Sequence, residues 1–183
     1  MPCAVALVLL AFTAHAAEPL PLGELAKPGR VLMLRHANAP GIGDPPNFKL
    51  DDCSTQRNLD AAGRAQAAKL GERLATAGVA RAQVYSSQWC RCLETARLLK
   101  LGPVTELPAL NSFFGRAQDG EATLAALRAF LASLPTDGPP VVLVTHQVTI
   151  SAFTGRGVAS GGGTVFELIG SGAPRVLGEV EAN

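Results

Sequence analysis

Two histidines of the chain stand where ligand chemistry is most often found in α/β proteins. His36 follows the apolar run 31–34 and Arg35. His146 follows the apolar run 141–144 with one residue between. If both runs are parallel strands, their carboxyl ends form one rim, where the ligands of open α/β sheets bind. A single histidine at either place would more often be structural, but the pair beside Arg35 favours catalysis.

Arg91 is a second arginine predicted to lie at this rim. It follows the strand-like segment 83–85 and a Ser-Ser turn, in the first turn of the next predicted helix. A planar guanidinium matches phosphate oxygens, and a helix N-terminus favours anions. Considered alone, Arg91 is better explained by a surface ion pair with Glu94 or another neighbour. Combined with Arg35 and the two histidines, it indicates an anion site.

The elements that must position these residues alternate between strand and helix. Strands are predicted at 31–34, 83–85, around Val104, 141–144, 164–169 and 175–180. Helices, with apolar residues at three- and four-residue steps, are predicted over 60–78, 89–99 and 121–134. This alternation is typical of an α/β fold, here a three-layer α/β/α sandwich with a mostly parallel central sheet. The last two strands are predicted to form a hairpin at the sheet edge.

Composition and charge favour one globular domain without a nucleic-acid partner. The chain has 183 residues, 48% of them apolar, which is enough for a sizeable core. Its 16 Lys and Arg against 15 Asp and Glu leave a net charge of +1. So small a charge creates no field that would gather nucleic acid. No internal repeat is visible, and the domain is predicted to span residues 30–183.

The N-terminal residues have the composition of a signal peptide. Residues 1–16 carry no Asp, Glu, Lys or Arg and run from an apolar stretch into Ala14-His15-Ala16, a small-x-small cleavage pattern. Residues 17–29 are interpreted as a linker. The alternative for residues 1–16 is a short buried helix. A leader predicts a periplasmic or secreted protein, with no stable membrane insertion once the leader is removed.

Three cysteines, Cys53, Cys90 and Cys92, remain after removal of residues 1–16. In an oxidising compartment one disulfide is expected, between Cys53 and either Cys90 or Cys92, with the third thiol left free. The alternative is three reduced structural thiols. A zinc site is less favoured, because a Cys-x-Cys pair and one distant cysteine offer no fourth ligand at the usual spacing.

Four segments carry a pattern that runs in order from about residue 30 to residue 155. They are Leu34-Arg35-His36-Ala37, residues 55–67, residues 86–96 and Val144-Thr145-His146. These segments resemble the Arg-His, Leu-x-x-x-Gly-x-x-Gln-Ala, Ser-x-x-x-Arg-x-x-x-Thr-Ala and second-histidine motifs of the histidine phosphatase superfamily, whose fold is shared with cofactor-dependent phosphoglycerate mutases. The resemblance implies a phosphoglycerate mutase-like fold and a small secreted or periplasmic bacterial phosphatase.

The resemblance implies a mechanism that needs neither metal nor cofactor. His36 attacks phosphorus and carries a phosphohistidine intermediate, and neutral imidazole is available at about pH 7. The arginines that hold the phosphate oxygens are Arg35, Arg91 and Arg57, while His146 donates a hydrogen bond to the same group. Water then releases phosphate from the enzyme. The implied substrate is a small phosphorylated compound or a phosphoprotein.

The general acid departs from the superfamily pattern. Larger members place a glutamate a short way after the strand that follows the arginine-bearing helix, where this chain has Asn111. Asparagine cannot protonate a leaving alkoxide, and Gln147 stands where another branch has an acid after the second histidine. The nearby carboxylates considered as substitutes are Glu106, Asp119 and Glu121. Without an acid, the better substrates have good leaving groups, such as phosphohistidine, acyl phosphates or aryl phosphates.

The loop 38–57 is long, rich in Pro, Gly and Asp, and without periodicity. Because it directly follows a strand end, it is predicted to cover the mouth of the site. Phe48 is a candidate shield against water and equally a candidate packing anchor. Pairing of Cys53 with the helix that carries Arg91 would tie this loop to the phosphate site.

Three other functions compete with a phosphatase. A mutase needs contacts to a second phosphate and a cytosolic setting, which the short chain and its leader disfavour. A catalytically weak or inactive phosphate- or phosphoprotein-binding domain of the same fold fits the missing acid. A metal site built from His36, His146 and carboxylates is disfavoured, because two arginines at one rim would repel a cation.

Overall fold

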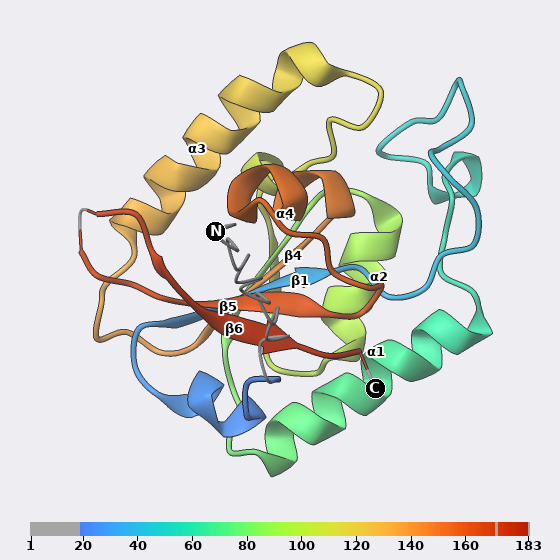
Figure 1. Cartoon of the computed structure of the whole chain (residues 1–183). Helices are drawn as coiled ribbons and strands as arrows, with labels where there is room; N and C mark the ends of the chain where they lie inside the picture. Colours follow the sequence, from blue (N-terminus) through green and yellow to red (C-terminus); the bar gives the residue numbers. More distant parts are fainter. Residues whose placement is uncertain (1–18, 171, 183) are drawn as a thin grey trace, which may run out of the picture.

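The computed structural model describes residues 19–170 and 172–182. Within this part of the chain, six strands form one sheet in the order β3-β2-β4-β1-β5-β6 (Figure 1). The strands are β1 (Arg30–Arg35), β2 (Gln83–Ser86), β3 (Val104–Glu106), β4 (Val141–Thr145), β5 (Gly163–Glu167) and β6 (Arg175–Val180). The predicted signal peptide, residues 1–16, lies outside the described residues.

The sheet is mostly parallel, as the alternation of strand and helix predicts. β3, β2, β4 and β1 are parallel neighbours, and β5 pairs antiparallel with β1. β5 and β6 form an antiparallel hairpin, and β6 is the edge strand. The tail hairpin is therefore confirmed, with its first strand inserted next to β1.

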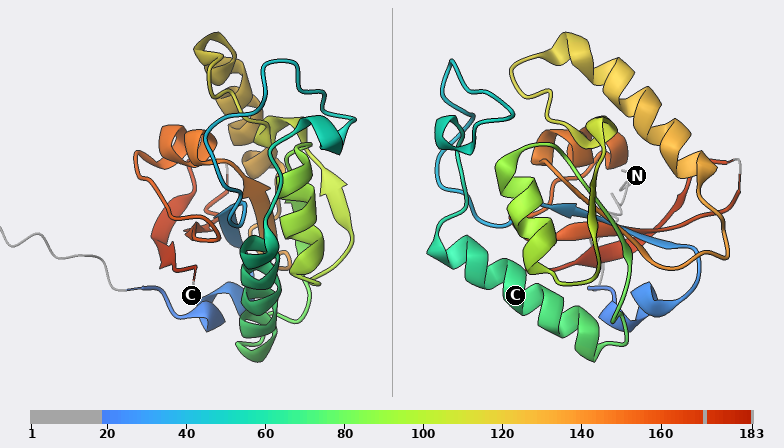
Figure 2. Two further views of the ribbon diagram at one scale, coloured as in Figure 1. Left: turned by 90° about the vertical axis from the view of Figure 1, so that its right-hand side faces the viewer. Right: turned by 180° about the vertical axis from the view of Figure 1, so that it is seen from behind.

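In the part of the chain that the structure describes, four α-helices cover the two faces of the sheet. They are α1 (Ala61–Thr76), α2 (Cys90–Leu98), α3 (Gly120–Ser133) and α4 (Gln147–Thr154). α1 packs with α2 on one face, and α3 packs with α4 on the other (Figures 1 and 2). Short 3-10 helices lie at Leu22–Ala26, Cys53–Thr55, Pro108–Leu110 and Ala117–Asp119. The three-layer α/β/α sandwich predicted from the sequence is the observed fold.

The central strands are buried on both faces, which explains their continuous apolar runs. In β1, Leu32 packs in the core under α1 and α2, together with Leu74. The next residue, Met33, packs in the opposite core, together with Leu127 of α3. Since successive side chains of a strand point to opposite faces, a strand covered by helices on both sides must be apolar at every position.

The interpretation of residues 17–29 as a linker is wrong from residue 20 onward. Leu25 is buried in the core beneath α1. The backbone N–H of Leu20 donates to the carbonyl oxygen of Glu179 at 2.9 Å. The prolines in this segment indicated a linker, but its leucines pack on the domain and extend it toward the N-terminus.

α4 was not predicted. It begins directly after His146, with no turn to announce it, and is only eight residues long. Val148, Thr149 and Ile150 are β-branched, and such residues have a lower helix propensity than unbranched ones. The helix ends at Gly155, whose φ of 72° is the left-handed conformation typical of a residue that closes a helix.

Gly63 and Gln66 of α1 fix the backbone that follows His36. Gln66 Oε1 accepts a hydrogen bond from the Asn38 N–H at 2.9 Å, and Asp60 Oδ2 accepts from Asn38 Nδ2 at 2.9 Å. A Cβ atom at Gly63 would lie 2.0 Å from the carbonyl oxygen of Asn38. The Gly-x-x-Gln spacing of the motif thus allows close contact between α1 and the strand end that carries the histidine.

We expect Gly63→Ala to destabilise the protein by about 1–3 kcal/mol, because the added methyl group overlaps the Asn38 backbone. Helix propensity alone predicts the opposite sign, a gain of about 1 kcal/mol. Urea unfolding measures the difference, and Ala62→Gly on the exposed side of the same turn is the control, with a cost of no more than about 1 kcal/mol. A Gly63→Ala variant more stable than the parent would show that α1 does not press on this segment.

Candidate active site

The pairing of β1 with β4 brings the two histidines together. Arg35 is the register partner of Thr145, so the next residue on each strand is a histidine. The His36 N–H donates to the carbonyl oxygen of Thr145 at 3.0 Å, and the two imidazole centroids lie 5.5 Å apart. Both side chains are 3% exposed. The rim predicted from the sequence therefore exists.

Arg91 lies between the two histidines, and its guanidinium is fully hydrogen-bonded. Its Nε donates to His36 Nε2 at 3.2 Å, and one terminal nitrogen donates to His146 Nδ1 at 3.3 Å. The carboxylate of Asp44 accepts from both terminal nitrogens, at 2.8 and 3.2 Å. The Arg57 carbonyl oxygen accepts a further bond at 3.3 Å. Five acceptors thus match the five N–H donors of the buried side chain.

These contacts fix the tautomers of both histidines, because a guanidinium only donates hydrogen bonds. His36 Nε2 must accept from Arg91, so the ring proton is on Nδ1, which donates to the Ala37 carbonyl oxygen at 2.8 Å. His146 Nδ1 must accept from Arg91, so its proton is on Nε2, which contacts Ser87 Oγ at 2.8 Å. His36 therefore has an unprotonated Nε2 in the site.

The surroundings keep both imidazoles neutral. Burial is the main cause that lowers the pKa of His36 to about 3; the Ala37 hydrogen bond opposes it, and Arg91, Arg57 and Arg35 lower the pKa further. Burial also holds the pKa of His146 well below its usual value, again helped first by Arg91. A neutral imidazole at about pH 7 has the free electron pair that a nucleophile needs.

Asp44 was not among the predicted site residues, yet its carboxylate pairs with the buried guanidinium of Arg91. Besides the two bonds to Arg91, it accepts from Trp89 Nε1 and from the Arg57 backbone N–H, both at 3.0 Å. Burial by itself raises the pKa of Asp44, but the hydrogen bonds from Arg91 and Arg57 outweigh it and lower the pKa. Asp44 is therefore an ionised partner of Arg91.

Arg35 and Arg57 also line the pocket, with different surroundings. One terminal nitrogen of Arg35 donates to the Val158 carbonyl oxygen at 3.0 Å, and its Nε is buried without a hydrogen-bond partner. Arg57 instead donates to the carbonyl oxygens of Gly43, at 2.8 Å, and Ala39. Arg35 thus has a donor to spare, whereas Arg57 holds the loop 38–57 in place.

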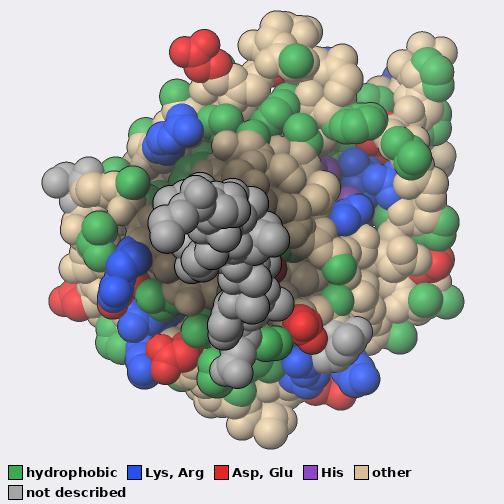
Figure 3. All heavy atoms as spheres, in the orientation of Figure 1, with side chains coloured by type: hydrophobic (Ala, Val, Ile, Leu, Met, Phe, Trp, Pro, Cys, Tyr) green, Lys and Arg blue, Asp and Glu red, His purple; other side chains and the backbone are tan. Residues whose placement is uncertain are grey.

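These groups form the floor of a pocket of about 800 Å³. Figure 3 shows the histidines and basic side chains together in a hollow, with hydrophobic side chains along its border. The lining comes from the strand ends, from the loop 38–57, from the start of α2 and from residues 112–116. Besides the two histidines and Arg35, Arg57 and Arg91, the side chains that line the pocket are Ile42, Asp44, Pro45, Pro46, Phe48, Trp89, Ser112, Phe114, Arg116, Gln147 and Val148.

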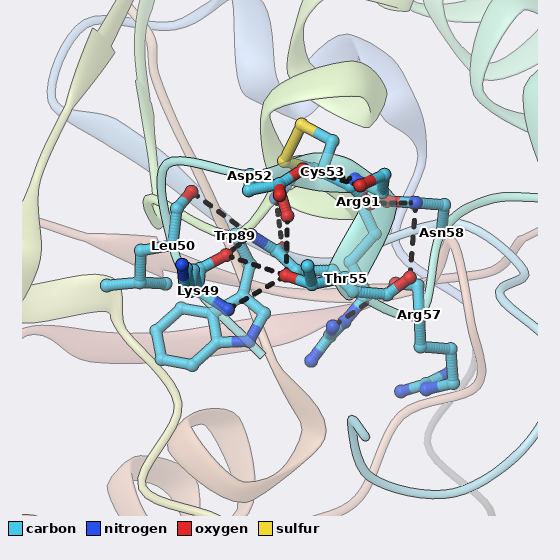
Figure 4. The surroundings of a disulfide bond; sticks show 12 residues. Lys49, Leu50, Asp52, Cys53, Thr55, Arg57, Asn58, Trp89 and Arg91 are labelled. Atoms are coloured by element: carbon cyan, nitrogen blue, oxygen red, sulfur yellow. Dashed lines mark hydrogen bonds between the residues drawn. A yellow bond between two sulfur atoms is a disulfide. The ribbon is translucent and has the colours of Figure 1, made fainter. Parts of the chain in front are cut away.

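A disulfide joins the loop to the start of α2 (Figure 4). It links Cys53 to Cys90, with 5.7 Å between their Cα atoms, and Cys92 is free and buried. Of the two pairings left open by the sequence, the structure has Cys53 with Cys90. Phe48 both lines the pocket and packs on Trp89, with 5.6 Å between ring centroids. The loop is thus held by covalent, ionic and aromatic contacts.

The three carboxylates considered as general acids do not reach this pocket. Glu106, at the end of the edge strand β3, accepts from Gln88 at 3.3 Å and lines a different pocket. Asp119 pairs with Arg116 at 3.5 Å, and Glu121 is exposed at the start of α3. Because β2 lies between β3 and β4, Glu106 at the end of β3 is too far from the pocket at the ends of β4 and β1.

Asn111, which stands where the resemblance implies a glutamate, has a structural role. Its Oδ1 accepts from Ser87 Oγ at 3.2 Å and from the Gln88 N–H at 3.0 Å. Ser87 in turn contacts His146. Asn111 therefore supports the second imidazole through Ser87. Gln147 accepts from Arg35 at 3.4 Å and also offers no proton for a leaving group.

Two kinds of feature are not found in residues 19–170 and 172–182. No group of three or more His, Cys, Asp or Glu side chains is arranged to hold a metal ion. No helix there has the length and apolar character needed to cross a bilayer.

The sequence matches one known protein family over more than half of its length. Residues 31–129 match the model of the histidine phosphatase superfamily, branch 1. The chain belongs to this superfamily. The matched range includes the segments with His36, Arg57 and Arg91, and the segment with His146 lies beyond it. The resemblance inferred from four sequence segments is confirmed for the superfamily as a whole.

Two solved structures are similar in fold to this chain. The protein histidine phosphatase SixA complexed with tungstate has 18% identity and a TM-score of 0.61, covering 84% of this chain and 97% of that one. The mycobacterial glucosyl-3-phosphoglycerate phosphatase Rv2419c with inorganic phosphate has 19% identity and a TM-score of 0.57, with 84% and 97% covered. The search of curated proteins gave no match. At these identities the structures show a shared fold.

The buried neutral histidines of this superfamily member predict a loss of stability in acid. An unfolded imidazole takes up its proton at about pH 6.5, but folded His36 only at about pH 3. Between these values the unfolded state binds more protons, so the free energy of unfolding falls as the pH falls, by up to about 1.4 kcal/mol per pH unit for each histidine.

Urea unfolding at about pH 7 and pH 5 measures this slope. His36→Asn should lose less stability between the two pH values than the parent, because one of the two histidines is removed. Asp51→Asn, an exposed change in the same loop, should keep the parent slope. Equal slopes for His36→Asn and the parent would mean that His36 is protonated alike in both states.

Proposed function

We propose that the chain is a phosphatase that hydrolyses phosphomonoesters through a phosphohistidine on His36. The observation that carries the proposal is the position of His36 Nε2, unprotonated and 3.2 Å from the buried guanidinium of Arg91. A nucleophile and the cation that would hold the phosphate oxygens therefore meet at one point. Two proteins of similar structure, a protein histidine phosphatase and a glucosyl-3-phosphoglycerate phosphatase, support the same reaction class.

In the first step, the electron pair of His36 Nε2 forms a bond to phosphorus while the P–O bond to the leaving group breaks. Arg35 offers its unpaired Nε to a phosphate oxygen. Arg91 exchanges a contact to His36 or Asp44 for the phosphate, and Arg57 can do so from the loop. Several preformed cationic donors around the transferred group are the main source of catalysis in phosphoryl transfer.

His146 takes part through its Nδ1 atom. In the structure without ligand, this atom accepts from Arg91. A phosphate dianion beside it favours the protonated imidazole, because an opposite charge stabilises the charged form. Protonated His146 then donates from Nδ1 to a phosphate oxygen, while Nε2 keeps its contact to Ser87. The three arginines and His146 supply the positive charge, so the proposed reaction is independent of a metal ion.

In the second step, water attacks phosphorus. The N–P bond breaks, its electron pair returns to His36 Nε2, and inorganic phosphate leaves with the proton balance completed by solvent. Asp44, the one carboxylate in the pocket lining of the described residues, has a lowered pKa and is ionised. It cannot donate a proton to the group that leaves in the first step.

This lack of an acid favours one alternative, a phosphate- or phosphoprotein-binding domain that turns over slowly or not at all. A mutase is less well supported, because the lining adds one basic residue, Arg116, beyond the three arginines of the floor. The natural substrate in either case is a small phosphorylated compound or a phosphoprotein.

We expect His36→Ala to lower the turnover of a generic aryl phosphate by about a thousandfold or more, since the covalent route is lost. His146→Ala should lower kcat/KM by about a hundredfold or more. Phosphate release measures both, and Asp51→Asn is the control with parent activity. Rapid quenching with labelled substrate should place label on the peptide that contains His36. Tight phosphate binding by a parent without turnover would favour the binding domain.

We also propose that the protein works in the periplasm or outside the cell. The Cys53–Cys90 disulfide supports this, since structural disulfides persist in oxidising compartments. The leader-like composition of residues 1–16 agrees with it.

Expression of the full chain in a Gram-negative host tests the location and the disulfide together. We expect the protein in the periplasmic fraction, beginning after Ala16. Trypsin cleaves after Arg91, between Cys90 and Cys92, so peptide mapping separates the two possible partners of Cys53. The expected product is the Cys53 peptide joined to the peptide that ends at Arg91, with Cys92 alkylated without reductant. A cytosolic chain with Cys53 alkylated would contradict the proposal.

A further inference from the structure

The floor of the pocket is cationic, and its mouth is mainly apolar, with Arg116 as an exposed basic residue beside Phe114. Ile42 is 91% exposed and Phe114 is 60% exposed, and both line this pocket. They come from loops far apart in the sequence, yet the Phe114 ring lies against the backbone next to Ile42, within 3.7 Å of where a Cβ at Gly43 would be. Scattered exposed hydrophobic residues need no explanation, but a cluster at the mouth of a site marks a binding surface.

The apolar surface continues from the mouth toward the phosphate site. Pro45, Pro46 and Val148 line the same pocket, and the rings of Phe48 and Trp89, tilted by 40°, pack on each other within it. A pocket of about 800 Å³ is of the size that encloses a whole drug-like molecule. A phosphate group fills only the cationic end, so the rest of a substrate that fills the pocket lies among these apolar side chains and beside Ser112, Arg116 and Gln147.

A second, independent observation concerns the leaving group. The superfamily position of the acid is Asn111, which is bonded to Ser87 and Gln88, and the three substitute carboxylates lie outside the pocket. A leaving group that no acid protonates must depart as a stable anion. A phenol, whose pKa is about 10 in tyrosine, does so far more readily than an aliphatic alcohol.

We propose that the substrates are aryl phosphates, with the ring held between Ile42, Phe114 and Trp89; this inference rests on the proposed function. His36 Nε2 bonds to phosphorus as the P–O bond breaks, and the phenolate keeps the electron pair and takes a proton from solvent. Water then cleaves the N–P bond as described above. The same side chains serve a small aryl phosphate or the ring of a phosphotyrosine in a peptide.

Substrate comparison separates the contribution of the ring from that of the leaving group. We expect phenyl phosphate and phosphotyrosine to exceed glycerol phosphate in kcat/KM by about a hundredfold or more, since both rim contacts and leaving group favour them. Octyl phosphate has the apolar group but a poor leaving group. It should therefore inhibit competitively at concentrations similar to the KM of phenyl phosphate, yet turn over slowly. A tyrosine-phosphorylated peptide and free phosphotyrosine distinguish the two sources of the ring.

Rim variants test the binding surface itself. Ile42→Ser and Phe114→Ser are changes of exposed side chains, and each should raise the KM of phenyl phosphate by roughly tenfold. Inhibition by inorganic phosphate should be unchanged, because that ion occupies only the cationic floor. Ile169→Ser is the matched control: Ile169 is 54% exposed and lies outside the pocket lining, and its KM should equal that of the parent.

The outcomes separate this inference from the proposed function. If glycerol phosphate and other aliphatic esters are hydrolysed as fast as phenyl phosphate, or if the rim variants keep the parent KM, the aryl preference is overturned while the phosphatase stands. If no phosphomonoester of either kind is hydrolysed in a manner that His36→Ala abolishes, the proposed function itself fails.

Discussion

The site depends on one buried guanidinium. Arg91 is 3% exposed, and a charge so far from water is tolerated only when hydrogen bonds and an opposite charge replace its hydration. Asp44 supplies the charge, and His36 and His146 supply two of the acceptors. The same contacts determine which imidazole nitrogens carry protons. The stability of Arg91 in the interior and the readiness of His36 for attack therefore have one cause.

Asp44 can fill this role only because the loop 38–57 is held against α2. The Cys53–Cys90 bond closes the loop onto the first turn of that helix, and Phe48 packs on Trp89 beside it. Trp89 Nε1 then donates to the carboxylate that binds Arg91. A covalent bond thus reduces the freedom of the loop that supplies the counter-ion, which is where a long irregular segment loses most entropy on ordering.

The parts of this arrangement that follow from local patterns were predictable. Apolar runs located β1 and β4, and because the carboxyl ends of parallel strands share one rim, His36 and His146 were predicted at the same rim. That β1 and β4 are direct neighbours is known only from the structure. Asp44 was not found, since its contacts come from the path of a loop without periodicity. Glu106 was considered on sequence distance alone, but the edge position of β3 removes it from the pocket. Tertiary geometry decides both cases, and no local pattern encodes it.

Positive side chains outnumber negative ones in the pocket lining. Four arginines line one pocket with a single carboxylate among the described lining residues. Three of them, Arg35, Arg57 and Arg91, lower the pKa of His36 and His146. Arg35 also keeps a buried Nε without a partner. A phosphate dianion supplies both the missing negative charge and the missing acceptor. Binding and stability are therefore linked, because a ligand that binds only the folded state shifts the equilibrium toward it. The excess of positive charge that favours phosphate binding for catalysis is thus also the reason that a bound anion stabilises the fold.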